Sequence, residues 1–199
     1  MDYLINLITA FGYFGYVILF IIIFLESFPL TFFLPGDSLL FTTGFLASQG
    51  YFNVAFLILV LFVGSFLGYI FSYFMGKKIG DFILQSNDKY WFKKKHLDYT
   101  EKFFQKYGDK TIIIGRFVPI VRSFAPTLAG AVEMNYSRFI RDSFIGALIW
   151  IFAVTLTGYY LGRIIPGADK YLTLIVLVII VISLSPTVFE YIKHRKQNS

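Results

Sequence analysis

The first part of this chain is almost free of charge. Across residues 3–76 the only charged side chains are those of Glu26 and Asp37, and the surrounding sequence is apolar. A second apolar stretch, further along the chain, carries Arg116 and Arg122 as its only charged residues. Charged groups inside a membrane are expensive to bury and are usually paired or functional. These two acids and two arginines are therefore the candidate functional residues.

The composition indicates an integral membrane protein. Hydrophobic residues make up 57% of the 199 residues and charged residues 15%, whereas a soluble domain carries roughly 25% charged residues. Four apolar runs approach the ~20 residues that a helix needs to cross the hydrocarbon core. The first run lacks the basic start and the cleavage site of a signal peptide, so we expect a retained helix within one transmembrane domain over residues 1–199. The four runs are residues 3–25, 52–75, 139–161 and 171–189.

Residues 111–132 are apolar but make a poor continuous span. Each proline removes a backbone hydrogen bond from a helix, and this stretch contains both Pro119 and Pro126 as well as the two arginines. Irregular backbone persists at membrane depth only where protein or a wet cavity surrounds it. We therefore predict a re-entrant hairpin here, shaped by these prolines together with Gly115 and Gly130.

Residues 27–50 are predicted to form a second re-entrant hairpin. They are too apolar for a free loop, and Pro29, Pro35 and Gly36 interrupt them. The two hairpins also begin alike, because a charged residue precedes the first proline by three positions in both ESFP and RFVP. Inverted repeats of broken helices are a recurrent plan of transporters. The sequence thus predicts an all-α polytopic membrane protein with four spanning helices and two opposed re-entrant helical hairpins.

Basic residues are concentrated in two polar segments. Residues 76–110 contain nine lysines against five acids, and the tail at residues 190–199 adds three basic residues. Positive segments remain in the cytoplasm, and both lie there only if residues 111–132 enter and leave the membrane by one face. We therefore expect a multi-pass protein with both termini in the cytoplasm. Within the first segment, residues 89–107 are weakly amphipathic, which fits either a helix on the inner leaflet or a solvated linker.

Small residues recur at every fourth position along two of the predicted spans. Such a row lines one face of a helix and lets another backbone approach closely. We interpret both rows as packing seams inside the monomer. The small residues are Gly64, Gly68, Ser72 and Gly76 in one span and Gly158 and Gly162 in another.

Two motifs resemble the signatures of the DedA family, also called SNARE-associated or VTT-domain proteins. They are FLPGDSLL at residues 33–40 and GRFVPIVRSFAPTLAG at residues 115–130. The flanking KYG, YSRF and GALIW also resemble the family, so the similarity covers nearly the whole chain. One departure stands out. Many bacterial members have Leu-Gly-Asp where this chain reads Leu67-Gly68-Tyr69, so any role of that acid is absent here or moved.

The resemblance implies a lipid transporter or scramblase of the bacterial cytoplasmic membrane. Bacterial members are implicated in returning undecaprenyl phosphate, the carrier lipid of wall precursors, across that membrane. Activity in the family tends to depend on a proton or sodium gradient. The resemblance also implies that Glu26, Asp37, Arg116 and Arg122 are functional charges.

The chemistry of these residue types fits an anionic lipid. Arginine presents a fork of donors that suits a phosphate, so we expect Arg116 and Arg122 to bind substrate. They stand six residues apart, on different faces of a straight helix, but a bend at Pro119 can turn both toward one headgroup. A buried carboxylate is driven toward its neutral form unless an arginine offsets this, so Glu26 and Asp37 are the candidates for proton coupling. A static ion-pair cluster that fixes the hairpins together is the alternative.

The expected function is translocation of undecaprenyl phosphate or a similar anionic polyprenyl-phosphate lipid, coupled to protons. The alternatives are a broader phospholipid scramblase or flippase, a cation or drug antiporter, and a lipid-modifying enzyme. We expect no enzyme activity and no catalytic residue, because Cys, HExxH and a Gly-rich nucleotide loop are absent from the sequence and the membrane serines have no histidine partner. We likewise expect no cofactor, no metal and no nucleic-acid partner, and the sequence leaves homo-oligomerisation open.

Overall fold

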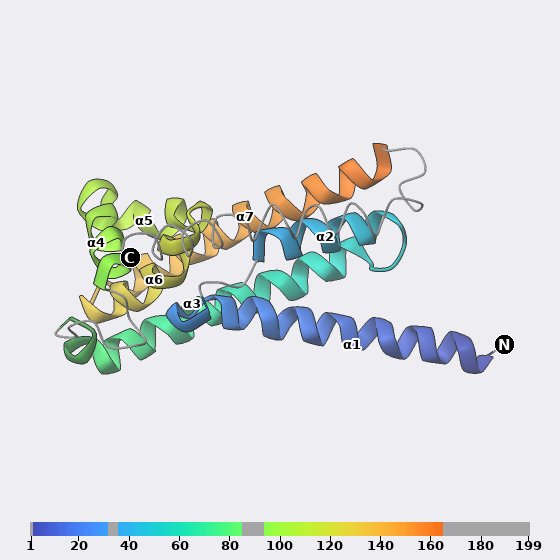
Figure 1. Ribbon diagram of the computed structural model, residues 1–199, viewed down its shortest axis with the longest axis horizontal. Helices are drawn as coiled ribbons and strands as arrows, with labels where there is room; N and C mark the ends of the chain where they lie inside the picture. The colour runs from blue at the N-terminus through green and yellow to red at the C-terminus, as the bar shows by residue number, and fades with distance from the viewer. Residues whose placement is uncertain (1, 32–35, 85–93, 165–199) are drawn as a thin grey trace, which may run out of the picture. The chain divides into compact units, whose positions relative to one another are not determined.

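The computed structural model of the protein describes residues 2–31, 36–84 and 94–164, and within these ranges every regular element is a helix. This confirms the all-α class for the described part of the chain. The predicted span over residues 171–189 lies outside it. The elements are α1 (Asp2–Glu26), the 3-10 helix η1 (Pro29–Thr31), α2 (Gly36–Ser48), α3 (Val54–Leu84), α4 (Lys94–Tyr107), the 3-10 helix η2 (Gly108–Lys110), α5 (Thr111–Ile114), the 3-10 helix η3 (Gly115–Phe117), α6 (Pro119–Ala131) and α7 (Tyr136–Ile164) (Figure 1).

Two of the described helices are long and apolar enough to cross a membrane. They are Val54–Lys78 within α3 and the whole of α7, Tyr136–Ile164. The segment Gly12–Glu26 of α1 is a shorter apolar helix. Asparagine caps set where the two long helices begin, because the Asn53 side chain accepts a hydrogen bond from the Phe56 amide at 3.0 Å and Asn135 accepts one from Arg138 at 3.2 Å. Each predicted span in the described ranges is therefore a helix.

The chain folds into two compact units. Of the described residues, 2–31, 58–84 and 94–152 belong to the first unit, and 36–57 and 153–164 belong to the second. In the second unit, α2 packs against the end of α7 through glycines. A Cβ atom on Gly158 would collide with the backbone oxygen of Phe41, and one on Gly44 would collide with that of Thr155. The predicted packing seam at Gly158 and Gly162 is thus confirmed as a contact within the monomer.

The small residues of α3 form the corresponding seam of the first unit. A Cβ atom on Gly68 would lie 2.7 Å from the backbone oxygen of Phe24 in α1, and Gly64 also faces α1. Two turns beyond Gly68, a Cβ atom on Gly76 would collide with the backbone oxygen of Thr127 in α6. This second row is also confirmed as a packing seam, which holds α1 and α6 against α3.

The described part of the amphipathic stretch, α4, is helical and packs on protein. Phe103 and Phe104 of α4 contact the core of the first unit, and Figure 1 shows α4 beside α5 and α6. Its apolar face therefore has protein partners, whereas a helix on a leaflet would turn that face to lipid. The core cluster consists of Tyr69, Tyr73, Ile112, Val121, Ala125, Ala129 and Phe139.

Residues 111–132 are broken at one point, whereas the sequence suggested two. The short α5 and η3 end at Val118, whose φ of −117° and ψ of 109° are extended, and Pro119 then begins α6. Gly115 lets the two arms approach, because a Cβ atom there would lie 2.6 Å from a methyl group of Val121. Pro126, in contrast, lies inside α6 and does not end it.

The other predicted break is described only in part. Pro29 is the first residue of η1 and Gly36 is the first residue of α2, whereas Pro35 lies outside the described residues. In the second predicted hairpin, Gly130 permits the close packing of α6 on α3. A Cβ atom on it would collide with the backbone oxygen of Tyr73 in α3.

Candidate functional site

A cluster of polar side chains is buried inside the first unit, around a cavity of about 10 Å³. Its residues come from the end of α1 and the residue after it, the middle of α3, η3, the start of α6, and α7. A cavity of this size holds about one water molecule. The residues that line it are Ile23, Glu26, Ser27, Ser65, Tyr69, Arg116, Arg122 and Trp150.

Glu26 is placed in the cluster by the end of α1. Pro29 has no amide hydrogen, so it cannot donate to the carbonyl of Leu25 four residues earlier. The chain tightens into 3-10 turns there, and the Thr31 hydroxyl donates to that same carbonyl. The helix thus stops at Glu26, whose side chain is left in the protein interior with the residue only 2% exposed.

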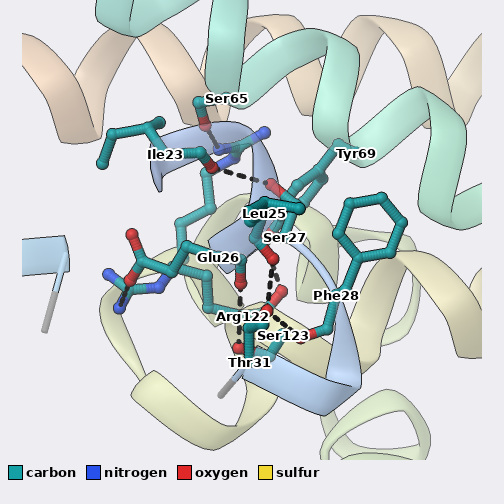
Figure 2. A network of polar contacts seen from close by, with 11 residues as sticks. Ile23, Leu25, Glu26, Ser27, Phe28, Thr31, Ser65, Tyr69, Arg122 and Ser123 are labelled. Carbon is teal, nitrogen blue, oxygen red and sulfur yellow. Dashed lines mark hydrogen bonds and ion pairs between the residues drawn. The ribbon is translucent and has the colours of Figure 1, made fainter. Parts of the chain in front are cut away.

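Glu26 and Arg122 form a buried ion pair. The Nη2 atom of Arg122 donates to Oε1 of Glu26, and the two side chains are 5% and 3% exposed. The Arg122 guanidinium also lies over the ring of Trp150, 4.7 Å from its centroid. Figure 2 shows the two charged side chains beside each other, with Ser123 donating to the backbone oxygen of Glu26 at 3.3 Å. The end of α1 is thereby held to the first turn of α6.

Arg116 is fully buried and is surrounded mainly by neutral groups. Its Nη1 atom donates to the Ser65 hydroxyl at 2.6 Å, and Nη2 donates to the backbone oxygen of Ser143 at 3.3 Å. Its Nε atom is buried with no hydrogen-bond partner. Among the residues that the structure describes, no carboxylate lies within ion-pair distance of this guanidinium. An unneutralised buried charge is unfavourable, so this cation is suited to receive an anion.

Space for Arg116 comes from a glycine of α7. A Cβ atom on Gly146 would lie 3.1 Å from Cδ and 3.2 Å from Nε of Arg116. Any larger residue at this position would therefore press on the arginine. Gly146, the glycine of the GALIW motif, thus leaves the space that the Arg116 side chain occupies.

Tyr69 contacts both arginines. Its ring lies under the Arg116 guanidinium, 3.6 Å from ring centroid to Cζ, and its hydroxyl donates to the backbone oxygen of Arg122 at 3.0 Å. That oxygen needs a partner, because Pro126 stands four residues later in α6 and has no amide hydrogen. This explains why α6 continues through Pro126 although the sequence suggested a break.

Three of the four predicted charged residues meet in this cluster: Glu26, Arg116 and Arg122. Asp37 belongs to the second unit, where it is half-buried in the first turn of α2. An acid in the first turn is favourably placed toward the positive end of the helix dipole. The bend at Val118 and Pro119 lies between the two arginines, and both of them line the one cavity.

Sequence reasoning did not single out Ser65, Tyr69 or Trp150 as site residues. Tyr69 had a signal, because it stands where the sequence departs from Leu-Gly-Asp. Trp150 lies in the GALIW motif, and Ser65 follows a glycine of the packing seam. Within the described ranges, no group of three or more His, Asp or Glu side chains is arranged to hold a metal ion.

Comparison with known proteins identifies the family. The family model described as the VTT domain matches residues 34–160. Protein DedA of Escherichia coli is 40% identical over 197 residues, which cover 98% of this chain and 90% of that protein. An uncharacterized membrane protein of Mycobacterium tuberculosis is 40% identical over 183 residues, covering 88% and 79% of the two chains.

The inner membrane protein YqjA of Escherichia coli is 36% identical over 152 residues, which cover 74% of this chain and 68% of that protein. No solved structure matches the chain. The matched domain includes the break at Val118, both arginines and Tyr69, and the similarity to DedA extends over α1 and Glu26 as well. The chain therefore belongs to the DedA family of VTT-domain membrane proteins.

Proposed function

We propose that this protein moves undecaprenyl phosphate, or a similar anionic polyprenyl-phosphate lipid, across the bacterial cytoplasmic membrane. The observation that supports this most strongly is the pair of buried arginines around one cavity. Arg122 is bonded to Glu26, whereas Arg116 has only neutral hydrogen-bond partners. An anionic headgroup would supply the charge that Arg116 lacks.

A phosphate monoester is the headgroup that this chemistry favours. Its oxygen atoms accept several charge-assisted hydrogen bonds at once, and arginine donates them in a planar fork. Arg116 and Arg122 together offer two such forks on one cavity. A zwitterionic phospholipid also carries a phosphate, but its own cation would have to be accommodated beside two guanidiniums.

The small volume of the cavity requires that the cluster rearranges on binding. About 10 Å³ does not admit a phosphate group, so the Glu26–Arg122 pair has to separate for a headgroup to enter. Protonation of the carboxylate would weaken that pair and free Arg122, and loss of the proton would restore the pair and expel the lipid. Glu26 is thus the first candidate for proton coupling, and Asp37 remains the second.

The membrane arrangement that we propose has four spanning helices and two opposed re-entrant hairpins, at about residues 27–50 and 111–132. The lengths of α1, α3 and α7 support three of the spans. The extended backbone at Val118, between short helical arms, supports the second hairpin. Placement of both termini in the cytoplasm follows from the lysines of residues 76–110 and the basic tail.

Reconstitution into liposomes tests the function directly. Movement of undecaprenyl phosphate between leaflets is measured beside movement of labelled phosphatidylethanolamine, with empty liposomes as background. The control variant is Arg138→Gln, which removes an exposed arginine that pairs with Asp109 and does not line the cavity. We expect faster movement of undecaprenyl phosphate in wild type and in the control. Equal movement of both lipids would replace the proposal by a general scramblase, and movement of neither would contradict it.

A further inference from the structure

We propose that Tyr69 is a positioning residue that fixes the positions of Arg116 and Arg122 relative to each other. This inference rests on the proposed function, because it assigns to one side chain the spacing of the two phosphate-binding groups. It starts from the two contacts of Tyr69, which use different parts of the same side chain. The ring engages the guanidinium of Arg116, and the hydroxyl engages the backbone of Arg122.

The hydroxyl contact is needed because of Pro126. In an uninterrupted helix the carbonyl of Arg122 would accept the amide hydrogen of residue 126, but proline has none. Arg122 is only 4% exposed, so water has little access to that oxygen. The Tyr69 hydroxyl supplies a donor at 3.0 Å and joins α6 to α3 at the residue that carries the guanidinium.

The ring contact keeps Arg116 charged without occupying its donors. A cation over an aromatic face is stabilised by the negative face of the ring. The N–H donors of the guanidinium lie in its own plane, where Nη1 meets Ser65, Nη2 meets Ser143, and Nε has no partner. A carboxylate in place of the ring would neutralise the cation and would compete with an anionic ligand. Tyr69 stabilises the charged guanidinium of Arg116 and leaves it available to bind an anionic ligand.

The backbone of α3 fixes Tyr69 in this place. Gly68 lies against α1, where a Cβ atom would be 2.6 Å from the Ser27 hydroxyl oxygen and 2.7 Å from the backbone oxygen of Phe24. The Ser72 hydroxyl donates to the backbone oxygen of Ser27 at 2.7 Å, one turn further along α3. The contacts of Gly68 and Ser72 therefore fix the backbone of α3 before and after Tyr69, and Tyr69 itself is only 1% exposed.

A thermal double-mutant cycle tests the hydroxyl contact. Tyr69→Phe, Pro126→Ala and the double variant are purified in detergent, and their melting temperatures are compared. Tyr69→Phe should lower Tm by about 2–4 °C, as expected for one lost hydrogen bond. In the Pro126→Ala background the same substitution should have little effect, because the new amide hydrogen at position 126 bonds the Arg122 carbonyl. An equal loss in both backgrounds would overturn the assignment.

A binding measurement tests the ring contact. The probe is farnesyl phosphate in detergent, and farnesol, which has the same tail without the phosphate, is the control ligand. Tyr69→Leu should raise the Kd for farnesyl phosphate roughly tenfold above that of Tyr69→Phe, which keeps the ring. Farnesol should bind both variants alike. Equal weakening of both ligands in Tyr69→Leu would mean a general loss of structure and would overturn the positioning role.

The two measurements separate this inference from the function on which it rests. If wild-type protein binds farnesyl phosphate no better than farnesol, the proposed function is contradicted. The thermal cycle does not involve a lipid, so it then decides alone whether Tyr69 holds the backbone of Arg122.

Discussion

Glu26 and Arg122 stand 96 residues apart in the sequence and form an ion pair whose side chains are both almost completely buried. The pair joins the end of α1 to the first turn of α6. Both helices are interrupted close by, the first before Pro29 and the second at Val118. The ion pair thus connects the two segments in which the helical structure is interrupted.

Breaking this pair from one side should destabilise the protein. Glu26→Leu or Arg122→Leu each leaves one buried charge, for which a loss of about 3–5 kcal/mol is expected. The double variant should lose much less than the sum, because neither Glu26 nor Arg122 is then left buried without the other. Thermal unfolding in detergent measures the difference, with Arg138→Leu at an exposed pair as the control, where a loss of about 0–1 kcal/mol is expected. Additive losses would show that the pair contributes nothing beyond its separate side chains.

The glycines where α3 crosses α6 should not tolerate a methyl group. A Cβ atom on Gly76 would collide with Thr127, and one on Gly130 would collide with Tyr73. Alanine at either position should cost about 1–3 kcal/mol, since backbone has to move. Gly12→Ala is the matched control, because nothing lies within 4 Å of a Cβ atom there. In that open helical position alanine should be neutral or stabilising, and similar losses at all three glycines would contradict the close crossing.

The proposed topology predicts which residues can be reached from each side of the membrane. Single cysteines can be introduced by Lys93→Cys, Ile165→Cys and Lys196→Cys, since the chain has no native cysteine. These positions lie outside the described residues, and the prediction rests on the distribution of lysines. Membrane-impermeant maleimide should label positions 93 and 196 from the cytoplasm and position 165 from outside. Labelling of 93 and 196 from opposite faces would mean that residues 111–132 span the membrane.

Much of this arrangement was accessible from the sequence. Long apolar runs predicted α1, α3 and α7, and the rows at every fourth residue predicted the seams of α3 and α7. Three of the four isolated charges, Glu26, Arg116 and Arg122, do lie together around one cavity, and charged side chains are rare enough in apolar sequence to single them out. The break at Pro119 was also predictable, since proline is tolerated at the first position of a helix and restricts the residue before it.

What the sequence did not reveal depends on contacts between distant segments. Pro126 looks like a helix breaker until Tyr69, 53 residues before Arg122, is found to satisfy the carbonyl that it frees. Similarly, no local pattern distinguishes Arg122, which pairs with Glu26, from Arg116, which stacks on a ring. The face of α4 that packs on the core was equally ambiguous, because Phe103 and Phe104 could serve a lipid surface or a protein core.

Proton coupling predicts that the rate of lipid movement depends on pH and that one acid is responsible. Protonation of Glu26 would release Arg122 for the phosphate. Asp37 is the second candidate acid, and a neutral amide at either position cannot titrate. Glu26→Gln or Asp37→Asn should therefore flatten the pH dependence, measured in liposomes at equal amounts of folded protein. A merely structural acid would reduce the amount of folded protein and leave the pH dependence intact. Wild-type dependence in both variants would exclude these acids as the coupling site.

The role of the arginines is tested most directly by replacing them with lysine. Lysine keeps the positive charge but loses the planar fork that holds two phosphate oxygens. The measurement is the rate at which undecaprenyl phosphate moves between leaflets of liposomes that contain wild type, Arg116→Lys, Arg122→Lys or the matching alanine variants, with exposed Arg138→Lys as control. The lysine variants should be impaired almost as strongly as the alanine variants, while the control keeps the wild-type rate. Full activity in both lysine variants would contradict the claim that Arg116 and Arg122 grip the phosphate of a lipid in transit.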